Sequence, residues 1–226
     1  MTFSIVARDT QTGAFGVAIC SSSPAVAARC SHVRSGVGAV ASQNITDPRL
    51  GARALDLLAN GHTPADAVAV IEKDTEHFAY RQLLVIDAKN AGAVHAGAHT
   101  LGVGGESRAA DALAAGNLLA SADVPRAMTD AFTAAAASAH FGERLVAALE
   151  AGVAAGGEAG PVRSAGLLLV RDLPFPLADL RVDWSEGCPV AELRALWRIY
   201  FPQMEEYVTR AVDPRSAPSF GVPGDE

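Results

Sequence analysis

Short apolar runs separated by turn residues fill the first fifty positions of the chain. FSIVAR at 3–8 and AFGVAIC at 14–20 are joined by DTQTG, whose last residue is a glycine. Two apolar runs joined in this way predict a β-hairpin. VGAVASQN at 37–44 predicts a third strand, and the glycines that flank its start would let another backbone approach closely.

Helical spacing replaces this pattern after residue 47. Asp47-Pro48 and Thr63-Pro64 each place a capping side chain directly before a proline, and apolar residues follow at intervals of three and four. This arrangement is typical of helix starts. A second hairpin is predicted at 81–98, whereas residues 101–120 are rich in glycine and are expected to be irregular.

The C-terminal half continues with helices that we predict at about 124–138 and 142–155. RSAGLLLVRD at 163–172 is a continuous apolar run between turn residues, which predicts a strand buried on both faces. A last helix is expected to start near Pro189, and the prolines that follow it predict a flexible tail over 212–226.

The order of these elements indicates the fold class. Strands that neighbour strands, and helices that neighbour helices, disfavour a strictly alternating layout of strand and helix. The pieces suit an α+β fold in which two packed antiparallel sheets carry helices on their outer faces. Because the chain has 226 residues, we expect a single domain over residues 1–211, with the tail outside it.

Composition narrows the choice of partners. The chain has 18 Lys and Arg against 25 Asp and Glu, a net charge of −7, which is unsuited to nucleic acid or to an anionic membrane surface. No apolar run approaches the ~20 residues of a membrane span, and no signal sequence is recognisable, so a cytoplasmic protein is expected. The cysteines lack zinc-ligand spacing, and His95 and His99 alone do not complete a site, so neither a metal nor a cofactor is expected.

Thr2 stands directly behind the initiator methionine, at the head of the first predicted strand. If Met1 is removed, Thr2 carries a hydroxyl and a free α-amine, whose ordinary pKa of about 7.7–8.0 leaves roughly a tenth of it neutral at pH 7. The amine can then act as general base for the hydroxyl of the same residue. While Met1 remains, that nitrogen is an amide and cannot serve as a base. Thr is also a common second residue without any role.

The opening TFSIVARD at 2–9, followed by a GxxGVA strand at 13–18, resembles an uncharacterised bacterial family of the N-terminal-nucleophile (Ntn) hydrolase superfamily, of the domain-of-unknown-function 1028 type. Later segments, among them GVGAVASQN, LGARALDLLANG, AAGNLLA, LVAALEAGVAAGG and RSAGLLLV, extend the resemblance over roughly residues 2–200. It implies a four-layer αββα sandwich and amide-bond hydrolysis through Thr2. The stretch between Gly97 and Gly116 departs from the family's more aromatic, proline-containing segment. If this loop shapes the pocket, substrate preference differs from that of the relatives.

Candidate partners of Thr2 include two asparagines, one at the end of the third predicted strand and one in the segment GNLL. Asn44 and Asn117 are candidate oxyanion-hole donors, and their alternative role is turn formation or helix capping. Ser4 lies on the same strand face as Thr2 because side chains alternate along a strand. It could orient the amine, or it could simply pack.

Further candidate supporting or substrate-binding residues lie where two other predicted strands begin or end. Ser21, Ser22 and Ser23 end the second strand beside the first, where a hydroxyl could hold the amine. Arg34 precedes the third strand and could lower the pKa of the amine or bind a substrate carboxylate, although a solvated surface position is the alternative. Arg163 and Ser164 open the buried strand and are weaker candidates.

The leading hypothesis is an Ntn-type amidohydrolase that cleaves a small amide, isopeptide or ureide C–N bond through Thr2. A non-catalytic protein that binds a small molecule on the same fold is the alternative. A third hypothesis is a subunit whose main role is assembly, with an apolar surface over Trp197–Phe201 as the interface. We expect a small-molecule substrate, no nucleic-acid or membrane partner, and a homo-oligomer.

Overall fold

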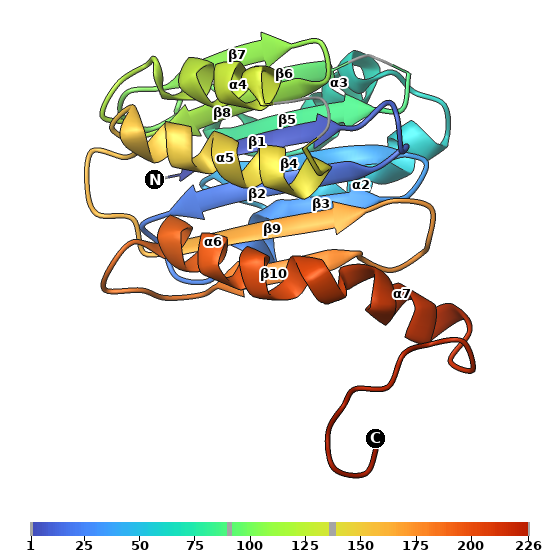
Figure 1. Ribbon diagram of the computed structural model, residues 1–226. Coiled ribbons are helices and arrows are strands. Elements are labelled where there is room, and N and C mark those ends of the chain that lie inside the picture. Colours follow the sequence, from blue (N-terminus) through green and yellow to red (C-terminus); the bar gives the residue numbers. More distant parts are fainter. Residues whose placement is uncertain (1, 90–91, 136–138, 226) are drawn as a thin grey trace.

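Two antiparallel β-sheets form the centre of the protein (Figure 1). The computed structural model describes residues 2–89, 92–135 and 139–225. One sheet has six strands in the order β10-β9-β2-β1-β8-β7, and the other has four in the order β3-β4-β5-β6. The strands are β1 (Thr2–Arg8), β2 (Phe15–Ser21), β3 (Ser31–Arg34), β4 (Gly38–Asn44), β5 (Arg81–Asp87), β6 (Gly92–Ala96), β7 (Gly105–Ala109), β8 (Ala112–Asn117), β9 (Ser164–Val170) and β10 (Ala178–Val182).

The two sheets share an apolar layer, and the central strand β1 shows how its side chains are divided. Val6 belongs to the cluster between the sheets, together with Ala41 and Leu84 from the four-stranded sheet. Phe3 and Ile5 belong to a different cluster, on the other face of the six-stranded sheet. Because side chains alternate along a strand, Thr2 and Ser4 share the face of Val6 and point toward the four-stranded sheet.

Helices cover the outer face of each sheet. On the six-stranded sheet lie α4 (Val124–Ala134), α5 (Phe141–Ala154) and α6 (Pro189–Tyr200), and on the four-stranded sheet lie α2 (Arg49–Ala59) and α3 (Pro64–Asp74). The remaining helical elements are α1 (Val26–Cys30), the 3₁₀ turns at Phe78–Tyr80 and Phe201–Gln203, and α7 (Met204–Val212). Within the described ranges, no helix has the length and apolarity needed to cross a membrane.

The first hairpin and the capped start of α3 are confirmed, whereas α2 begins at Arg49 with Pro48, and not Asp47, at its N-cap. β1 and β2 pair in an antiparallel register from Phe3–Cys20 to Arg8–Phe15. The Thr63 hydroxyl accepts a hydrogen bond from the Asp66 amide at 3.2 Å, which caps α3. The hairpin expected at 81–98 is β5 and β6.

The expectation of irregular structure over residues 101–120 is wrong for most of that stretch. Residues 105–109 and 112–117 form β7 and β8, and β8 is fully buried beside β1. β8 consists largely of alanine and glycine, so it lacks the alternation of apolar and polar residues that reveals a half-exposed strand. The sequence patterns also missed the short elements α1, β3 and β10. The helix predicted at 124–138 ends at Ala134, since Ala135 has left the helical conformation, and residues 136–138 lie outside the described residues.

The aromatic surface expected at the C-terminal helices is only partly exposed. Trp197 is 1% exposed, and its indole N–H donates to a Glu143 carboxylate oxygen at 2.9 Å, so it belongs to the core. Ile199 and Phe201 are 66% and 42% exposed. An interface between copies of the chain at these residues stays a prediction, which light scattering can check.

Candidate active site

Thr2 lies at the polar end of the layer between the two sheets. It pairs across β1 and β8 with Asn117, and its side chain shares a face with Ser4. The Ser4 hydroxyl donates to the Gln43 side-chain oxygen at 2.7 Å, which joins β1 to β4 in the other sheet. Thr2 is 4% exposed, and Ser4, Gln43 and Asn117 are fully buried. At the start of β1, the layer between the sheets therefore contains buried polar side chains in place of apolar ones.

A chain of hydroxyl groups runs from Thr2 to a guanidinium. The Thr2 hydroxyl donates to Ser21 Oγ at 3.3 Å, and Ser21 Oγ lies 2.9 Å from Ser23 Oγ. Arg29 Nη2 donates to Ser23 Oγ at 3.0 Å. The Ser23 amide also donates to Ser21 Oγ, at 3.1 Å. The hydroxyl chain therefore links Thr2 to the positive charge of Arg29.

Side-chain amides form a second network, on the opposite side of Thr2. Gln43 Nε2 donates to Gln82 Oε1 at 2.8 Å and to a β8 carbonyl at 3.2 Å, and Gln82 Nε2 donates to another β8 carbonyl at 3.1 Å. Since a carbonyl can only accept, these bonds fix the orientation of both glutamine amides. Asn117 Nδ2 donates to Gln82 Oε1 at 3.1 Å, so its orientation is fixed in turn.

This network leaves one acceptor without a donor. Asn117 Oδ1 is buried and has no hydrogen-bond partner among the described residues. An unpaired buried acceptor costs about 1–3 kcal/mol, and native proteins contain few of them. Because Asn117 is the cross-strand partner of Thr2, the unpaired oxygen lies in the immediate surroundings of the candidate nucleophile.

Glu158 brings a buried carboxyl group to the same edge. It lies in the loop after α5, where Gly156 and Gly157 adopt positive φ angles of 114° and 58°, and it is 5% exposed. Its two carboxylate oxygens accept from the Ser22 amide at 3.0 and 3.2 Å. Burial raises the pKa of Glu158 to about 7, against the opposing influence of the positive amino terminus and of the bond from Ser22. A buried group that titrates near neutrality is typical of functional sites.

Backbone strain concentrates at this edge as well. In the described part of the chain, the non-glycine residues with positive φ are Ala25, Asn44, His77 and Leu118, at 49°, 71°, 59° and 51°. Ala25 follows β2, Asn44 ends β4, His77 shortly precedes β5 and Leu118 follows β8. The pairing of β1 with β2 and β8, and of β4 with β5, places all four at the end of the sandwich where Thr2 lies. Such residues cluster at active sites and ligand clamps.

A hollow of about 230 Å³ adjoins the amide network. The Gln82 side chain forms part of its wall, and the rest comes from Ala96, Thr100, Glu106 and the glycines at 102, 104 and 105. The glycine-rich segment is tied to the end of β8, because the Leu118 and Leu119 amides donate to carbonyls of that segment at 2.8 and 2.9 Å. The stretch that departs from the family pattern in sequence therefore borders the candidate site.

Two of the predicted site residues, Asn44 and Ser22, hold segments next to this cluster. The Asn44 amide donates to the Tyr80 carbonyl at 2.6 Å and accepts from the Leu101 amide at 3.3 Å, so its side chain joins two loops. Ser22 contributes its backbone N–H to Glu158. The oxyanion role predicted for Asn44 and Asn117 remains a prediction.

The structure does not bring Arg34 to the cluster. Arg34 pairs with Gly38, at the opposite end of β4 from Asn44, and forms an ion pair with Asp56 at 2.8 Å. Six residues of strand separate Gly38 from Asn44, which corresponds to roughly 20 Å.

Arg163 and Ser164 hold the loop that follows β2. The Ser164 hydroxyl donates to the Ser23 carbonyl at 2.6 Å, and the Arg163 amide donates to the Ser21 carbonyl at 2.8 Å. The Arg163 guanidinium is directed to the surface, where it pairs with Glu186 at 2.7 Å. Both residues thus help to position Ser21 and Ser23 by hydrogen bonds to their backbone carbonyls.

Gln43, Gln82, Arg29 and Glu158 were not singled out from the sequence. Gln43 could have been found, because it continues the inward positions of Ala39 and Ala41 with period two. Glu158 carries no local signal, since the loop after α5 is held beside the end of β8 by a bridge between Glu158 and Leu119. Within the described residues, no cluster of three His, Cys, Asp or Glu side chains is arranged to hold a metal ion.

Most of the chain is similar to known proteins. The chain superposes on the crystal structure of protein SPO2555 from Silicibacter pomeroyi, a DUF1028 protein, with a TM-score of 0.81, 32% identity and 88% of each chain covered. Its likeness to Anbu (ancestral beta-subunit) from Yersinia bercovieri has a TM-score of 0.42 at 10% identity over 91% of this chain and 97% of that one, too low to support an argument. No curated protein matches the chain significantly. The model of the family of unknown function DUF1028 matches residues 2–193, and the chain therefore belongs to that family.

Proposed function

We propose that this protein is an amidohydrolase of the N-terminal-nucleophile type, which cleaves a small amide, isopeptide or ureide C–N bond through Thr2 once Met1 has been removed. The carrying observation is the position of Thr2, whose buried hydroxyl heads a central strand and enters a polar cluster between two sheets. The arrangement of α4–α6 and α2–α3 outside the two sheets supports the proposed four-layer αββα architecture.

The proposed reaction uses groups that belong to Thr2 itself. The neutral α-amine takes the hydroxyl proton as Oγ1 attacks the substrate carbonyl carbon, and the carbonyl oxygen becomes an oxyanion. When the C–N bond breaks, the amine passes its proton to the leaving nitrogen, and the acyl group remains on Oγ1 as an ester. Water then attacks this ester and releases the acid.

The surrounding side chains suit these steps. Asn117 Oδ1 is a fixed, unpaired acceptor beside Thr2, which suits it to receive a hydrogen bond from the free amine. The second hydrogen on Asn117 Nδ2 is a candidate donor to the oxyanion. Ser21 Oγ lies 3.3 Å from Thr2 Oγ1 and holds the hydroxyl in place until the amine takes its proton.

The test compares variants at residue 2 in the full-length protein. Thr2→Ala and Thr2→Ser both keep a small second residue, so both allow methionine removal, but only Thr2→Ser keeps a hydroxyl. Against a panel of small amides and p-nitroanilides, kcat/KM should fall at least ~10³-fold for Thr2→Ala and by much less for Thr2→Ser. Thr133→Ala, on the exposed face of α4, is the matched control and should be unchanged.

Undiminished turnover by Thr2→Ala would refute the proposed mechanism. The alternative function, non-catalytic binding of a small molecule, predicts a different pattern. Compounds would then raise the melting temperature of the parent and of Thr2→Ala equally, and the parent would show no turnover.

A further inference from the structure

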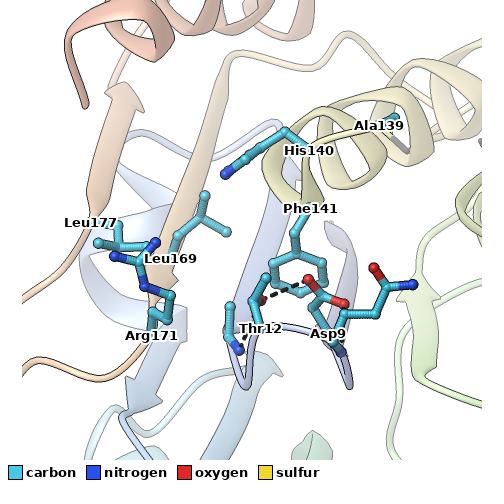
Figure 2. Close-up of a pocket in the computed structure, with 10 residues that line it drawn as sticks. Asp9, Thr12, Ala139, His140, Phe141, Leu169, Arg171 and Leu177 are labelled. Atoms are coloured by element: carbon cyan, nitrogen blue, oxygen red, sulfur yellow. Dashed lines mark hydrogen bonds between the residues drawn. The ribbon is translucent and has the colours of Figure 1, made fainter. Parts of the chain in front are cut away.

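A second hollow, of about 250 Å³, opens at the other end of β1 from Thr2 (Figure 2). It lies between the turn that joins β1 to β2, the start of α5, and the end of β9. Asp9, in its wall, is seven residues from Thr2, which along a strand corresponds to about 23 Å. The hollow is therefore separate from the candidate active site, and the proposed reaction gives it no role.

The floor of this hollow is apolar and its rim is polar. Ala14, Phe141, Leu169 and Leu177 supply apolar surface, and all four are at most 4% exposed. The volume lies below the ~300–1,000 Å³ of pockets for drug-sized molecules, so the ligand must be small. A few fixed polar groups above an apolar floor are typical of small-molecule sites.

Asp9 presents a carboxylate that its own turn holds in place. Oδ1 accepts from the Gln11 amide at 3.1 Å, and Oδ2 accepts from the Thr12 hydroxyl at 2.7 Å. Each oxygen keeps a further lone pair for a ligand. Because the carboxylate is already ordered, binding a cationic group there costs little conformational entropy.

His140 presents a fixed N–H donor. Its Nδ1 accepts from the Gly142 amide at 3.1 Å, so the proton of the neutral ring is on Nε2. The ring contacts those of Trp197 and Phe201, with centroids 5.4 and 4.9 Å away, which restricts its orientation. No hydrogen bond within the described ranges engages Nε2, and Figure 2 shows the ring directed into the hollow. Burial lowers the pKa of His140, which favours the neutral ring.

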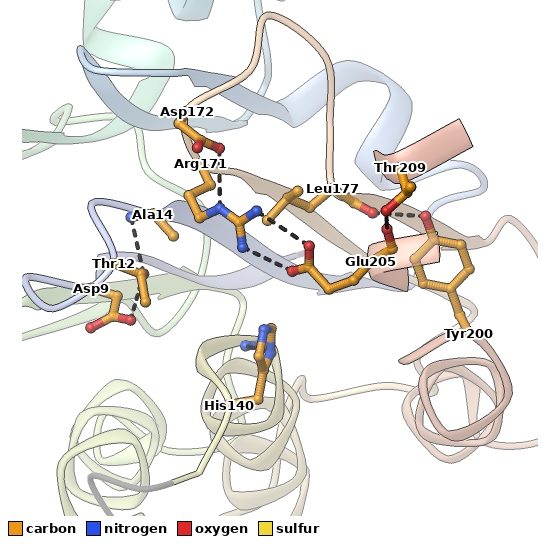
Figure 3. A network of polar contacts seen from close by, with 11 residues as sticks. Asp9, Thr12, Ala14, His140, Arg171, Asp172, Leu177, Tyr200, Glu205 and Thr209 are labelled. Atoms are coloured by element: carbon orange, nitrogen blue, oxygen red, sulfur yellow. Dashed lines mark hydrogen bonds and ion pairs between the residues drawn. The ribbon is translucent and has the colours of Figure 1, made fainter. Parts of the chain in front are cut away.

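Arg171 lies across the hollow from Asp9 (Figures 2 and 3). Its Nη1 and Nη2 donate to Glu205 at 2.8 and 3.3 Å, and its Nε donates to Asp172 at 3.1 Å. These bonds use three of the five guanidinium N–H groups and leave two for a ligand. The two acidic partners also offset the charge of Arg171, so the hollow does not suit a simple anion.

We propose that this hollow binds a free aliphatic α-amino acid as its zwitterion. The ammonium group lies against the Asp9 carboxylate, the carboxylate accepts from His140 Nε2 and the free N–H groups of Arg171, and the side chain covers Phe141 and Leu169. The Asp9 carboxylate on one wall, the N–H donors of His140 and Arg171 on the other, and the apolar floor between them select this ligand over a purely cationic, anionic or neutral compound of the same size.

Nuclear magnetic resonance titration of the ¹⁵N-labelled full-length protein with L-leucine tests the proposal. Saturable shifts are expected for the amides of residues 10–14 and 139–142, whereas those of residues 2–4 and 117 should not move. N-acetyl-leucine, which lacks the ammonium group, and leucinamide, which lacks the carboxylate, should each bind about tenfold more weakly or worse.

Asp9→Asn should weaken leucine binding by a similar factor, and Asp123→Asn, an exposed surface carboxylate, should not. If Asp9→Asn fails to fold, the three-ligand series on the parent decides alone. Equal binding of all three ligands, or no saturable shift with leucine, would overturn the proposal. Shifts at residues 2–4 and 117 would overturn it as well, by assigning leucine to the candidate active site. Thr2→Ala should bind leucine as the parent does, so this site and the proposed catalytic function succeed or fail separately.

Discussion

Glu158 links the stability of the fold to pH, in a direction opposite to that of an ordinary paired carboxylate. Burial raises its pKa from an ordinary 4.5 to about 7, so between these values the folded protein binds a proton that the unfolded chain has lost. The free energy of unfolding therefore falls as pH rises from 4.5 to 7, and it levels off above 7. One pKa unit corresponds to ~1.36 kcal/mol, so the difference of about 2.5 lowers the free energy of unfolding by about 3 kcal/mol in total.

Glu158→Gln removes this titration while keeping an oxygen that can accept from the Ser22 amide. We expect the variant and the parent to be about equally stable at pH 4.5, and the variant to be more stable at pH 8 by up to about 3 kcal/mol. Urea unfolding followed by tryptophan fluorescence at five pH values from 4.5 to 8.5 measures the difference. Glu72→Gln, at an exposed position of α3, is the control and should show no pH-dependent difference. A difference that stays flat with pH, or that favours the parent at pH 8, would refute the reasoning.

Three further changes test the packing and the buried networks, each by urea unfolding at fixed pH. Ser4→Ala leaves the buried Gln43 Oε1 without its donor and should cost about 1–3 kcal/mol; an unchanged midpoint would show that the bond is not needed. Gly38→Ala places a Cβ 2.2 Å from a β5 carbonyl oxygen and should cost about 3 kcal/mol. Gly104→Ala meets only ordinary contacts at 3.7 Å or more, so an equal loss in both glycine variants would contradict the explanation. Ala25→Gly relieves a φ of 49° and should stabilise the protein by about 0.5–1 kcal/mol, whereas a loss would show that the turn is not strained.

Local patterns were enough to predict the elements with strong signals. The β1–β2 hairpin, the capped start of α3 and the buried strand β9 all follow from apolar runs bounded by turn residues. β8 escaped prediction because a strand of alanine and glycine buried on both faces has no polar alternation to reveal it. β10 and β3 are short strands at sheet edges, where pairing with a neighbour, rather than the sequence of the strand itself, determines the structure.

The candidate site divides in a similar way. Thr2 and Ser21 were found because they lie at the ends of recognisable apolar runs, and Ser4 because it shares a strand face with Thr2. Asn117 was found only as an asparagine in the segment GNLL, and the register of β8 brings it to the same edge. Glu158 and Arg29 reach that edge through a loop and a five-residue helix, whose paths depend on tertiary contacts. Arg34 was chosen because it stands beside a predicted strand. Its position in the sequence does not reveal that this part of the strand lies at the end of the sandwich away from Thr2.

The state of the amino terminus tests the central claim most directly. We propose to treat the purified protein with p-nitrophenyl acetate, digest it, and identify the N-terminal peptide by mass spectrometry. The account predicts that the peptide begins at Thr2 and that, when turnover is quenched with acid and the digest is kept acidic, part of it carries an acetyl group that hydroxylamine removes, as expected for an ester on Oγ1. A protein that hydrolyses small amides while its N-terminal peptide still begins with Met1 would contradict it, because Thr2 would then have no amine to serve as its base.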